Sequence, residues 1–562
     1  MKKLLLLSII TLFISCKKSN EVLPKRGLIT QKAMVVSARE EASKIGVAIL
    51  EKGGNAFDAM VATDIALAVA YPYANSFGGG GFMVYRLEDG STGALDYREK
   101  APLASTRDMY LDEEGNMIPG KSTLGATAAG VPGGISGVFA VHEKFGSLPI
   151  KDILQPVADL ARNGFVITEK QAARFVAYDS IFTVVNGKTI LFSPDKKAND
   201  TLKNEALAQT IERIIANGKD EFYKGKTAEI LVKHLAEKGG IITMEDLAKY
   251  EAQWREPVRF KYKNLDVISM SPPASGGVCL AQIMTMIEPY DIGDMGHNSP
   301  KAIQLMVEAE RRAYADRSYY LGDPDFVDIP IDDLISEDYL GDRMDNFSWD
   351  KATLSSEVSH GNVMTYESNE TTHYSIVDQF GNAIAVTTTI NGGYGSKLYV
   401  DELGIFMNNE MDDFSSKPGE PNMFGLIGAE ANSIAPEKRM LSSMTPTLVE
   451  KDGQFWMTVG TPGGSTIITS VFQTILNVYE HGMTMQDAVN APRFHHQWLP
   501  DVVLFEPNSF SRETIQALQQ KGYNTNEDRS PVIGKVDGIL VLSDGTLEGG
   551  ADKRGDDTAI GF

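Results

Sequence analysis

Hydrophobic and polar positions follow two different periods along this chain, and the change of period divides it. From Ala33 to Ala70, and over much of residues 134–240, apolar residues recur at helical spacing. After Thr371 short strand-like runs replace this pattern, and helical spacing returns at residues 467–490. Helix-rich segments on both sides of a strand-rich segment predict a layered α/β or α+β protein with central sheets and helices outside.

Turn residues mark where the predicted elements end. Gly53-Gly54 separates two helices, and Asp89-Gly90 has the composition of a hairpin turn. Ser299-Pro300 favours a helix start, because serine caps free N–H groups and proline fits the first turn. Helices are expected at Glu40–Glu51, Ala56–Ala70, Ile150–Ala161, Glu205–Ala216, Ile467–Tyr479, Met485–Asn490 and after Ser299. Strands are expected at Phe82–Tyr85, Gly93–Tyr97, Thr371–Val377, Ala383–Thr389, Thr447–Glu450, Phe455–Val459 and Gly538–Leu542.

Two of these strands form a predicted hairpin that brings two threonines together. If the hairpin is symmetric about Phe380, Val377 faces Ala383 and Thr371 faces Thr389, with Cβ atoms about 5 Å apart. Thr389 would then hydrogen-bond the Thr371 hydroxyl. A slip of one residue would place the two side chains on opposite faces. The preference of threonine for strands is the plainer explanation of this composition.

That preference does not explain the segment before Thr371. Residues 337–370 are polar and weakly patterned, as an exposed and cleavable connection should be. If the chain is cut before Thr371, the freed α-amine can act as general base for the hydroxyl of the same residue. The unperturbed pKa of such an amine is about 7.7–8, so a useful fraction is neutral near physiological pH. The sequence therefore indicates an enzyme with Thr371 as its nucleophile.

Composition and charge narrow the class of protein. The chain has 562 residues, 43% of them hydrophobic and 23% charged, which is typical of a soluble globular protein. Its net charge of −22 argues against nucleic acid or an anionic membrane surface as a partner. No Cys/His cluster has the spacing of a zinc site. Cys279 precedes an apolar segment, so we expect a buried thiol and not a reactive one.

The start of the chain has a different character. Lys2 and Lys3 precede an apolar run, residues 4–14, that is too short to span a bilayer and has the form of a secretory signal. Residues 13–16, Phe-Ile-Ser-Cys, resemble the lipobox of bacterial lipoproteins, with phenylalanine in place of the usual leucine. This resemblance implies a signal peptide over 1–15, lipidation of Cys16 and a tether over 16–30. The protein would be exported to the periplasm or cell surface on a lipid anchor. A plain signal peptide with an accidental cysteine is the alternative.

Several motifs together resemble the γ-glutamyltranspeptidase family. Thr371–Asp378 and Gly381–Asn391, followed by Tyr394-Gly395, are similar to its signature, and Ile384 stands where valine is usual. The other similar motifs are Asp96–Pro102, Asn409–Phe414, Leu441–Met444 and Pro462–Ser465. The similarity covers nearly the whole chain after the leader.

The family resemblance implies a fold and a maturation step. The fold would be α+β, the four-layer αββα sandwich of N-terminal-nucleophile hydrolases. The chain would cut itself between Glu370 and Thr371. The products would be a large subunit, 31–370, and a small subunit, 371–562, that remain together as an intertwined heterodimer. No cofactor and no metal are implied.

The resemblance also implies an activity, which is γ-glutamyl transfer from glutathione and related γ-glutamyl compounds to amino acids, peptides or water. The implied catalytic residues are Thr371, Thr389, Gly463 and Gly464, and the two glycines would offer backbone N–H groups to the oxyanion. The residues implied to bind the donor α-carboxylate are Arg98, Ser442 and Ser443. Those implied to hold its α-ammonium are Glu410, Asp413 and Asn391.

Each of these motifs also has a purely structural explanation. For Arg98 it is a salt bridge with Glu99 or Asp96, and for Glu410 and Asp413 it is a solvated acidic turn. For the glycine pair it is a turn after a strand. Because the two acids are three residues apart, a helical turn would place them on one face.

The segment from Pro418 to Ala429 resembles the lid loop of many bacterial family members. Phe424 stands where some members carry tyrosine. The lid would therefore keep the apolar ring but lose the hydroxyl, and we expect it to be held closed less firmly.

Two other functions compete with γ-glutamyl transfer. Glutaryl-cephalosporin acylases share the fold and nucleophile, but their substrate lacks the α-ammonium that Glu410 and Asp413 would bind. A noncatalytic surface lipoprotein that binds peptides would leave the chain uncut.

Overall fold

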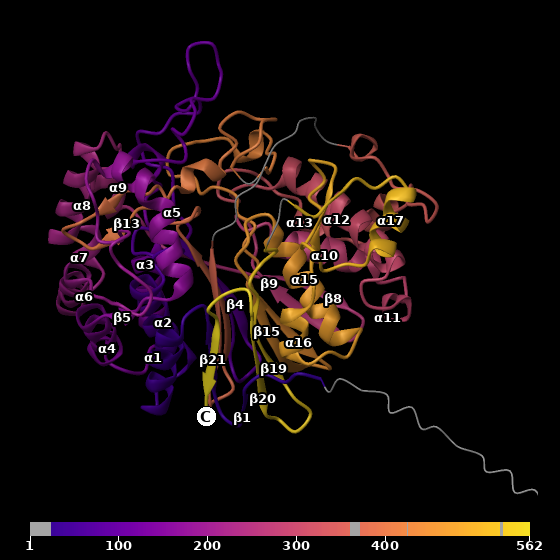
Figure 1. Cartoon of the computed structure of the whole chain (residues 1–562), viewed down its shortest axis with the longest axis horizontal. Helices are drawn as coiled ribbons and strands as arrows, with labels where there is room; N and C mark the ends of the chain where they lie inside the picture. The colour runs from indigo at the N-terminus through magenta and orange to yellow at the C-terminus, as the bar shows by residue number, and fades with distance from the viewer. Residues whose placement is uncertain (1–23, 360–370, 424, 529–531) are drawn as a thin grey trace, which may run out of the picture.

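The computed structural model describes residues 24–359, 371–423, 425–528 and 532–562, which form four layers (Figure 1). Two seven-stranded sheets lie face to face in the middle, and helices cover the outer face of each. The predicted αββα sandwich is therefore confirmed. The signal peptide, the lipidated Cys16 and Phe424 of the lid lie outside the described residues and stay predictions.

One sheet contains the predicted hairpin and is called the hairpin sheet. Its strand order is β21-β2-β10-β11-β3-β4-β7, and every neighbouring pair is antiparallel. Its strands are β2 (Met34–Ser37), β3 (Gly80–Arg86), β4 (Thr92–Asp96), β7 (Gln253–Arg255), β10 (Thr372–Val377), β11 (Ala383–Thr389) and β21 (Thr558–Gly561).

The second sheet has the order β1-β20-β19-β15-β14-β9-β8. Its strands are β1 (Ile29–Thr30), β8 (Val258–Tyr262), β9 (Leu265–Ser269), β14 (Thr447–Lys451), β15 (Gln454–Gly460), β19 (Asp537–Val541) and β20 (Leu547–Ala551). Short additional strands form three small sheets: β5 (Phe165–Val166), β6 (Thr201–Leu202), β12 (Tyr399–Val400), β13 (Ile405–Phe406), β16 (Phe494–His495), β17 (Val503–Phe505) and β18 (Thr525–Asn526).

Helices α1 to α9 lie on the side of the hairpin sheet, and α10 to α17 lie on the side of the second sheet (Figure 1). The first group is α1 (Glu40–Glu51), α2 (Ala56–Ala70), α3 (Gly134–Phe145), α4 (Ile150–Asn163), α5 (Glu169–Asn186), α6 (Glu205–Asn217), α7 (Asp220–Tyr223), α8 (Lys226–Glu237) and α9 (Met244–Ala248). The second group is α10 (Gly276–Ile287), α11 (Ile292–Met295), α12 (Pro300–Tyr320), α13 (Ile331–Leu334), α14 (Glu337–Arg343), α15 (Thr466–Tyr479), α16 (Met485–Asn490) and α17 (Arg512–Gln520). The predicted helices are all present, and α12 begins with the predicted Ser299 cap. The helical pattern expected from Ala33 begins only at Glu40, because Met34–Ser37 forms β2 and pairs with β10.

Alternation along the strands explains why the sheets are buried on both faces. Ile384 and Val386 of β11 pack with the helices of the first group. Ala383 and Ala385 of the same strand pack between the two sheets. Side chains of a strand point to opposite faces in turn, so a strand that is apolar throughout needs a layer on each side.

The hairpin has the predicted register. Val377 pairs with Ala383 and Thr372 pairs with Thr388, so Thr371 and Thr389 stand at the open end of the two strands. The Asp378 carboxylate closes the turn by accepting the backbone N–H groups of the residues that follow it. β2 and β3 flank the hairpin, so strands from both sides of the predicted cleavage point alternate in one sheet.

The predicted tether over 16–30 is too long at its C-terminal end. Arg26 forms an ion pair with Glu548 at 2.9 Å, and β1 adds to the edge of β20. The Lys25 backbone N–H donates to the Asp487 carboxylate at 3.0 Å, so the chain is held against the rest of the protein from Lys25 onward. Within the described ranges, no helix has the length and apolarity needed to cross a membrane.

Candidate active site

The predicted site residues meet in one cavity at the end of the sandwich where β10 begins and β11 ends. All of them except Gly463 line it, although they come from segments far apart in the sequence. The lining residues are Arg98, Arg317, Thr371, Thr389, Asn391, Glu410, Asp413, Asn422, Leu426, Leu441, Ser442, Ser443, Met444, Gly464 and Ile467.

The two threonines of the hairpin lie side by side at this end. Thr371 is buried and precedes β10, and Thr389 is the last residue of β11. The Thr389 hydroxyl accepts a hydrogen bond from the backbone N–H of Asn391 at 2.8 Å. The Asn391 side chain donates to the carbonyl of Asn409 at 3.0 Å. Thr389 therefore fixes the loop that carries Asn391, and its predicted hydrogen bond to Thr371 stays a prediction.

Gly463 and Gly464 connect β15 to α15 in a conformation that glycine favours. Their φ angles are +146° and +55°. A Cβ at Gly463 would lie 2.5 Å from the Thr466 hydroxyl. The Gly463 carbonyl accepts from the backbone and hydroxyl of Thr466 at 3.0 and 2.8 Å. The glycine pair thus sits at the N-terminus of a 14-residue helix, where the dipole favours negative charge.

Arg98 contacts two acids from a single turn. Its guanidinium reaches the Glu410 carboxylate through Nη1 and the Asp413 carboxylate through Nη2. Residues 410–413 form a 3₁₀ turn, so the predicted common face of these two acids is confirmed. The alternative partners of Arg98 are secondary: Glu99 lies 3.8 Å away, and the Asp96 carboxylate pairs with Arg255 at 3.0 Å.

Burial raises the proton affinity of the acids around Arg98. It raises the pKa of Asp413 to about 6 and that of Glu99 to about 8, and it raises the pKa of Glu410 well above its usual value. Neither carboxyl oxygen of Glu99 has a hydrogen-bond partner among the described residues. The cluster therefore resists full ionisation, and a cation bound there would stabilise its charged form.

The predicted serines lie beside a second buried guanidinium. The Ser443 hydroxyl accepts from Arg317 Nη2 at 3.0 Å, and Arg317 Nε donates to Ser275 at 2.9 Å. The Ser442 hydroxyl accepts from the backbone N–H of Met444 at 3.2 Å. Arg317 lines the cavity, so it adds positive charge on the side of the two serines.

Sequence reasoning missed Arg317 and Asn422. Arg317 lies on α12, whose pattern indicated only a packed helix, and nothing local shows which way the arginine faces. Asn422 donates to the Asp413 carboxylate at 3.2 Å from within the predicted lid segment. The lid resemblance was the signal that could have pointed to Asn422.

Other reactive groups are structural. Cys279 is buried, and burial raises the pKa of its thiol to about 12, as expected for an unreactive cysteine. Across the part of the chain that the structure describes, no group of three or more His, Cys, Asp or Glu side chains is placed to hold a metal ion.

Proteins similar to this chain are found both by sequence and by structure. The sequence profile of the family described as Gamma-glutamyltranspeptidase matches residues 42–562. The Glutathione hydrolase proenzyme of Escherichia coli (strain K12) is 45% identical over 537 residues, covering 95% of this chain and 92% of that protein. The crystal structure of Helicobacter pylori gamma-Glutamyltranspeptidase is 40% identical and covers 61% of this chain and 99% of its own, with a TM-score of 0.57. The cephalosporin acylase of Bacillus halodurans is 23% identical and covers 98% of this chain and 99% of its own, with a TM-score of 0.84, which is a likeness of fold. These neighbours confirm the predicted N-terminal-nucleophile hydrolase fold.

Proposed function

Because the chain belongs to the γ-glutamyltranspeptidase family, we propose that it transfers γ-glutamyl groups from glutathione and related compounds through an ester on Thr371. Acceptors are amino acids, peptides or water. Maturation comes first. The Thr371 hydroxyl attacks the carbonyl of Glu370, and the peptide bond becomes an ester as the Thr371 nitrogen leaves. Water then hydrolyses that ester and frees the α-amine of Thr371.

The freed amine serves the catalytic cycle as general base. It takes the Thr371 hydroxyl proton as the oxygen attacks the γ-carbonyl of the donor. The N–H groups of Gly463 and Gly464 stabilise the tetrahedral oxyanion. The amine then gives the proton to the departing amino group, which leaves the γ-glutamyl ester. An acceptor amine or water attacks the ester and restores the Thr371 hydroxyl.

One observation supports a γ-glutamyl compound as the donor. Arg98 contacts Glu410 and Asp413 in the cavity that also contains Thr371. An α-amino acid end is a zwitterion and can satisfy both signs of charge at once. Its carboxylate would take Arg98 with Ser442 and Ser443, and its ammonium would take the two acids with Asn391. Each buried charge would then keep a partner when the donor binds.

The same observation disfavours the acylase alternative. A glutaryl group has the carboxylate but lacks the ammonium, so it would add a negative charge beside Arg98, Glu410 and Asp413 and bring no cation to offset it. A noncatalytic peptide-binding protein would not require a buried threonine at the end of two strands.

Two valine variants in neighbouring positions test the proposal. Thr371→Val removes the proposed nucleophile, so we expect one full-length band on a denaturing gel and no chromophore released from a γ-glutamyl anilide. Thr372→Val is the matched control, because the Thr372 hydroxyl is buried and has no hydrogen-bond partner among the described residues. It should be cut into two fragments and remain active. A cut and active Thr371→Val protein would refute the proposal.

We also propose that the protein is exported and held on a bacterial membrane by lipid on Cys16. The support is the short apolar run and the lipobox-like residues 13–16. Mass spectrometry of the mature N-terminus decides this, since an unmodified Cys16 would exclude the anchor.

A further inference from the structure

Two cations share one tyrosine beside the proposed active site. Arg174 of α5 donates to the Tyr71 hydroxyl at 3.4 Å, and Lys535 donates to the same oxygen at 3.3 Å. The Arg174 guanidinium also stacks on the ring of Tyr73, 3.7 Å from its centroid. Both cationic side chains are half-buried. We call Arg174, Lys535 and the two tyrosines the Tyr71 cluster.

On one side the Tyr71 cluster adjoins the oxyanion glycines. The backbone N–H of Lys535 donates to the Thr461 hydroxyl at 2.7 Å, two residues before Gly463. A Cβ at Gly463 would lie 3.4 Å from the Cα of Gly534. Lys535 therefore stands directly behind the loop that stabilises the oxyanion.

On the other side the cluster adjoins the loop that carries Asn391. The Tyr73 carbonyl accepts from the backbone N–H of Tyr394 at 2.8 Å. A Cβ at Gly393 would lie 2.6 Å from the Tyr73 ring. The ring on which Arg174 stacks is thus packed against this loop, and the Tyr71 cluster connects the loop of Asn391 to the loop of the glycine pair.

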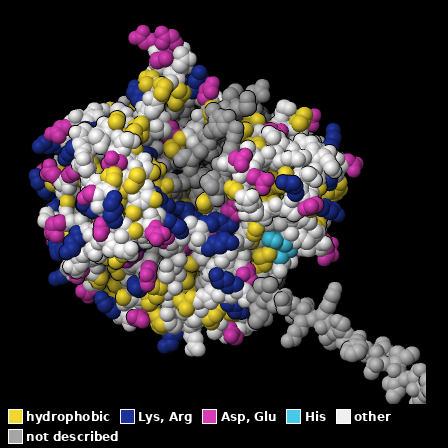
Figure 2. All heavy atoms as spheres, viewed as in Figure 1, with side chains coloured by type: hydrophobic (Ala, Val, Ile, Leu, Met, Phe, Trp, Pro, Cys, Tyr) yellow, Lys and Arg dark blue, Asp and Glu magenta, His cyan; other side chains and the backbone are white. Residues whose placement is uncertain are grey.

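Charge makes this cluster unusual in an acidic chain of net charge −22. Among the described residues, Arg174 contacts the Tyr71 hydroxyl and the two tyrosine rings, so no ion pair offsets its charge there. Lys170, one turn earlier on α5, pairs with Asp556 at 3.2 Å. Figure 2 shows Lys and Arg side chains gathered at the hollow between the two halves of the molecule.

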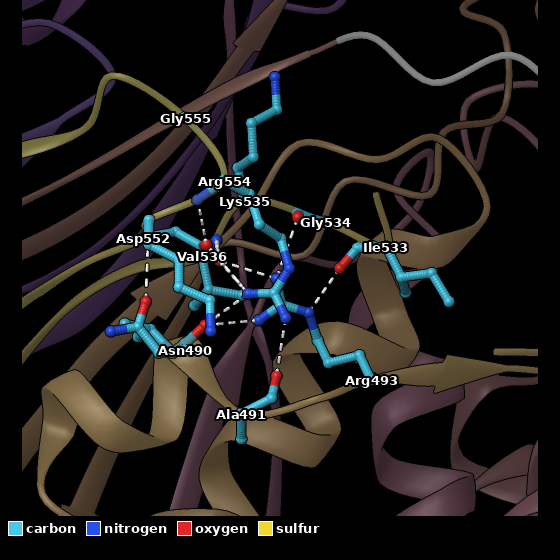
Figure 3. A network of polar contacts seen from close by, with 12 residues as sticks. Asn490, Ala491, Arg493, Ile533, Gly534, Lys535, Val536, Asp552, Arg554 and Gly555 are labelled. Atoms are coloured by element: carbon cyan, nitrogen blue, oxygen red, sulfur yellow. Dashed lines mark hydrogen bonds and ion pairs between the residues drawn. The ribbon is translucent and has the colours of Figure 1, made fainter. Parts of the chain in front are cut away.

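Lys535 is held on a rigid support (Figure 3). The Arg493 guanidinium donates to the carbonyls of Ile533 and Gly534 and pairs with Asp552 at 2.7 Å. The charge of Lys535 also lowers the pKa values of the buried Asp537 and Asp557 carboxyls, against the effect of burial. Its side chain extends away from the Arg493 network in Figure 3. A preorganised cation loses little freedom when it binds an anion.

We propose that the Tyr71 cluster is a subsite for the carboxylate of the leaving peptide and of the acceptor. This inference rests on the proposed function and extends it: the site takes amino acids or peptides with a free carboxylate on the far side of the scissile amide. The donor zwitterion occupies the cavity with Arg98, and the second carboxylate of glutathione lies at Arg174 and Lys535.

Two γ-glutamyl anilides that differ only by a ring carboxylate test the subsite. In Arg174→Gln and Lys535→Gln, kcat/KM for the carboxylated anilide should fall about tenfold. For the uncharged anilide it should change less than about twofold, because no charge pair is lost. Arg174→Lys should recover much of the loss. Glycylglycine and its amide give the same comparison for acceptors in the transfer step.

The control is Lys188→Gln, which removes a surface cation that pairs with Asp401 elsewhere and should affect neither anilide. Equal losses for both anilides, or no loss for either, would overturn the subsite. If the wild-type enzyme cleaves both anilides, the proposed function stands even if the variants contradict the subsite. A wild-type protein that cleaves neither would remove the proposed function and the subsite together.

Discussion

At the scale of single residues, the site is governed by how burial changes the protonation of its acids. Arg98 is always charged, and the acids around it are not. Burial raises the pKa of Asp413 to about 6, so this carboxyl is ionised at neutral pH and protonated in mild acid. Only the ionised form can hold an ammonium ion. Binding of the proposed donor should therefore depend on pH through the Asp413 carboxyl.

This link predicts the acid side of the pH profile. Below about pH 7.7 the Thr371 amine gains a proton, so log kcat/KM should fall with slope one. Below about pH 6 the Asp413 carboxylate is also lost, and the slope should steepen to two. Asp413→Asn should raise KM above about pH 6, where the wild-type carboxylate is ionised, and should remove the added steepening near pH 6. A des-amino donor should show slope one in the wild-type enzyme. A slope of two in Asp413→Asn would assign the second proton elsewhere.

At the scale of elements, the turn between β15 and α15 positions the two glycines that we propose as oxyanion donors. β15 lies in the middle of the second sheet and α15 packs on it, so both ends of the glycine pair are fixed. The positive φ angles of Gly463 and Gly464 turn their carbonyls toward α15. A side chain at Gly463 would disturb this turn, because its Cβ would lie 2.5 Å from the Thr466 hydroxyl.

Gly463→Ala should therefore lower kcat by about 10²- to 10³-fold with a smaller change in KM, the size of effect seen when one oxyanion donor is lost. The assay uses the cleaved fraction of the protein, since slow maturation is also expected. Gly453→Ala is the control at the other end of β15. Its φ is +77° and a Cβ there meets no atom within 4 Å, so it should cost about 1–2 kcal/mol of stability and leave kcat unchanged. Equal kcat in both variants would contradict the role of Gly463.

At the scale of the whole molecule, the two proposed subunits share both sheets. In the hairpin sheet, β10 and β11 of the small subunit lie between β2 and β3 of the large one. In the second sheet, β14 and β20 of the small subunit pair with β9 and β1. Separation would expose strand edges and a buried apolar layer on both pieces.

We therefore expect the two fragments to elute together on size exclusion after cleavage and to separate only in denaturant. Residues 371–562 expressed alone should not fold. A small fragment that elutes alone and folded would contradict this arrangement. The uncut Thr371→Val protein should elute at the same volume as the cleaved enzyme, because cleavage changes one bond and no sheet pairing.

Much of this could be predicted from local sequence. The helices α1 and α2 begin and end where the apolar pattern and the glycines placed them. The hairpin register followed from the turn at Phe380 and the two apolar strands. The family motifs contain most of the residues that line the cavity. The end of the tether was misplaced, since a two-residue strand such as β1 has no pattern of its own and is held by its partner β20.

The sequence by itself determined the order of elements, the chemistry of a threonine that can become an N-terminus, and the residue types suited to an amino acid donor. Those properties are local, because they depend on spacing within a few turns or strands. Tertiary structure alone decided that Arg98 meets Glu410 and Asp413, that Arg317 faces the cavity, and that Arg174 and Lys535 share Tyr71. These groups are separated by tens to hundreds of residues, and only the stacking of the two sheets and their helices brings their charges within contact distance.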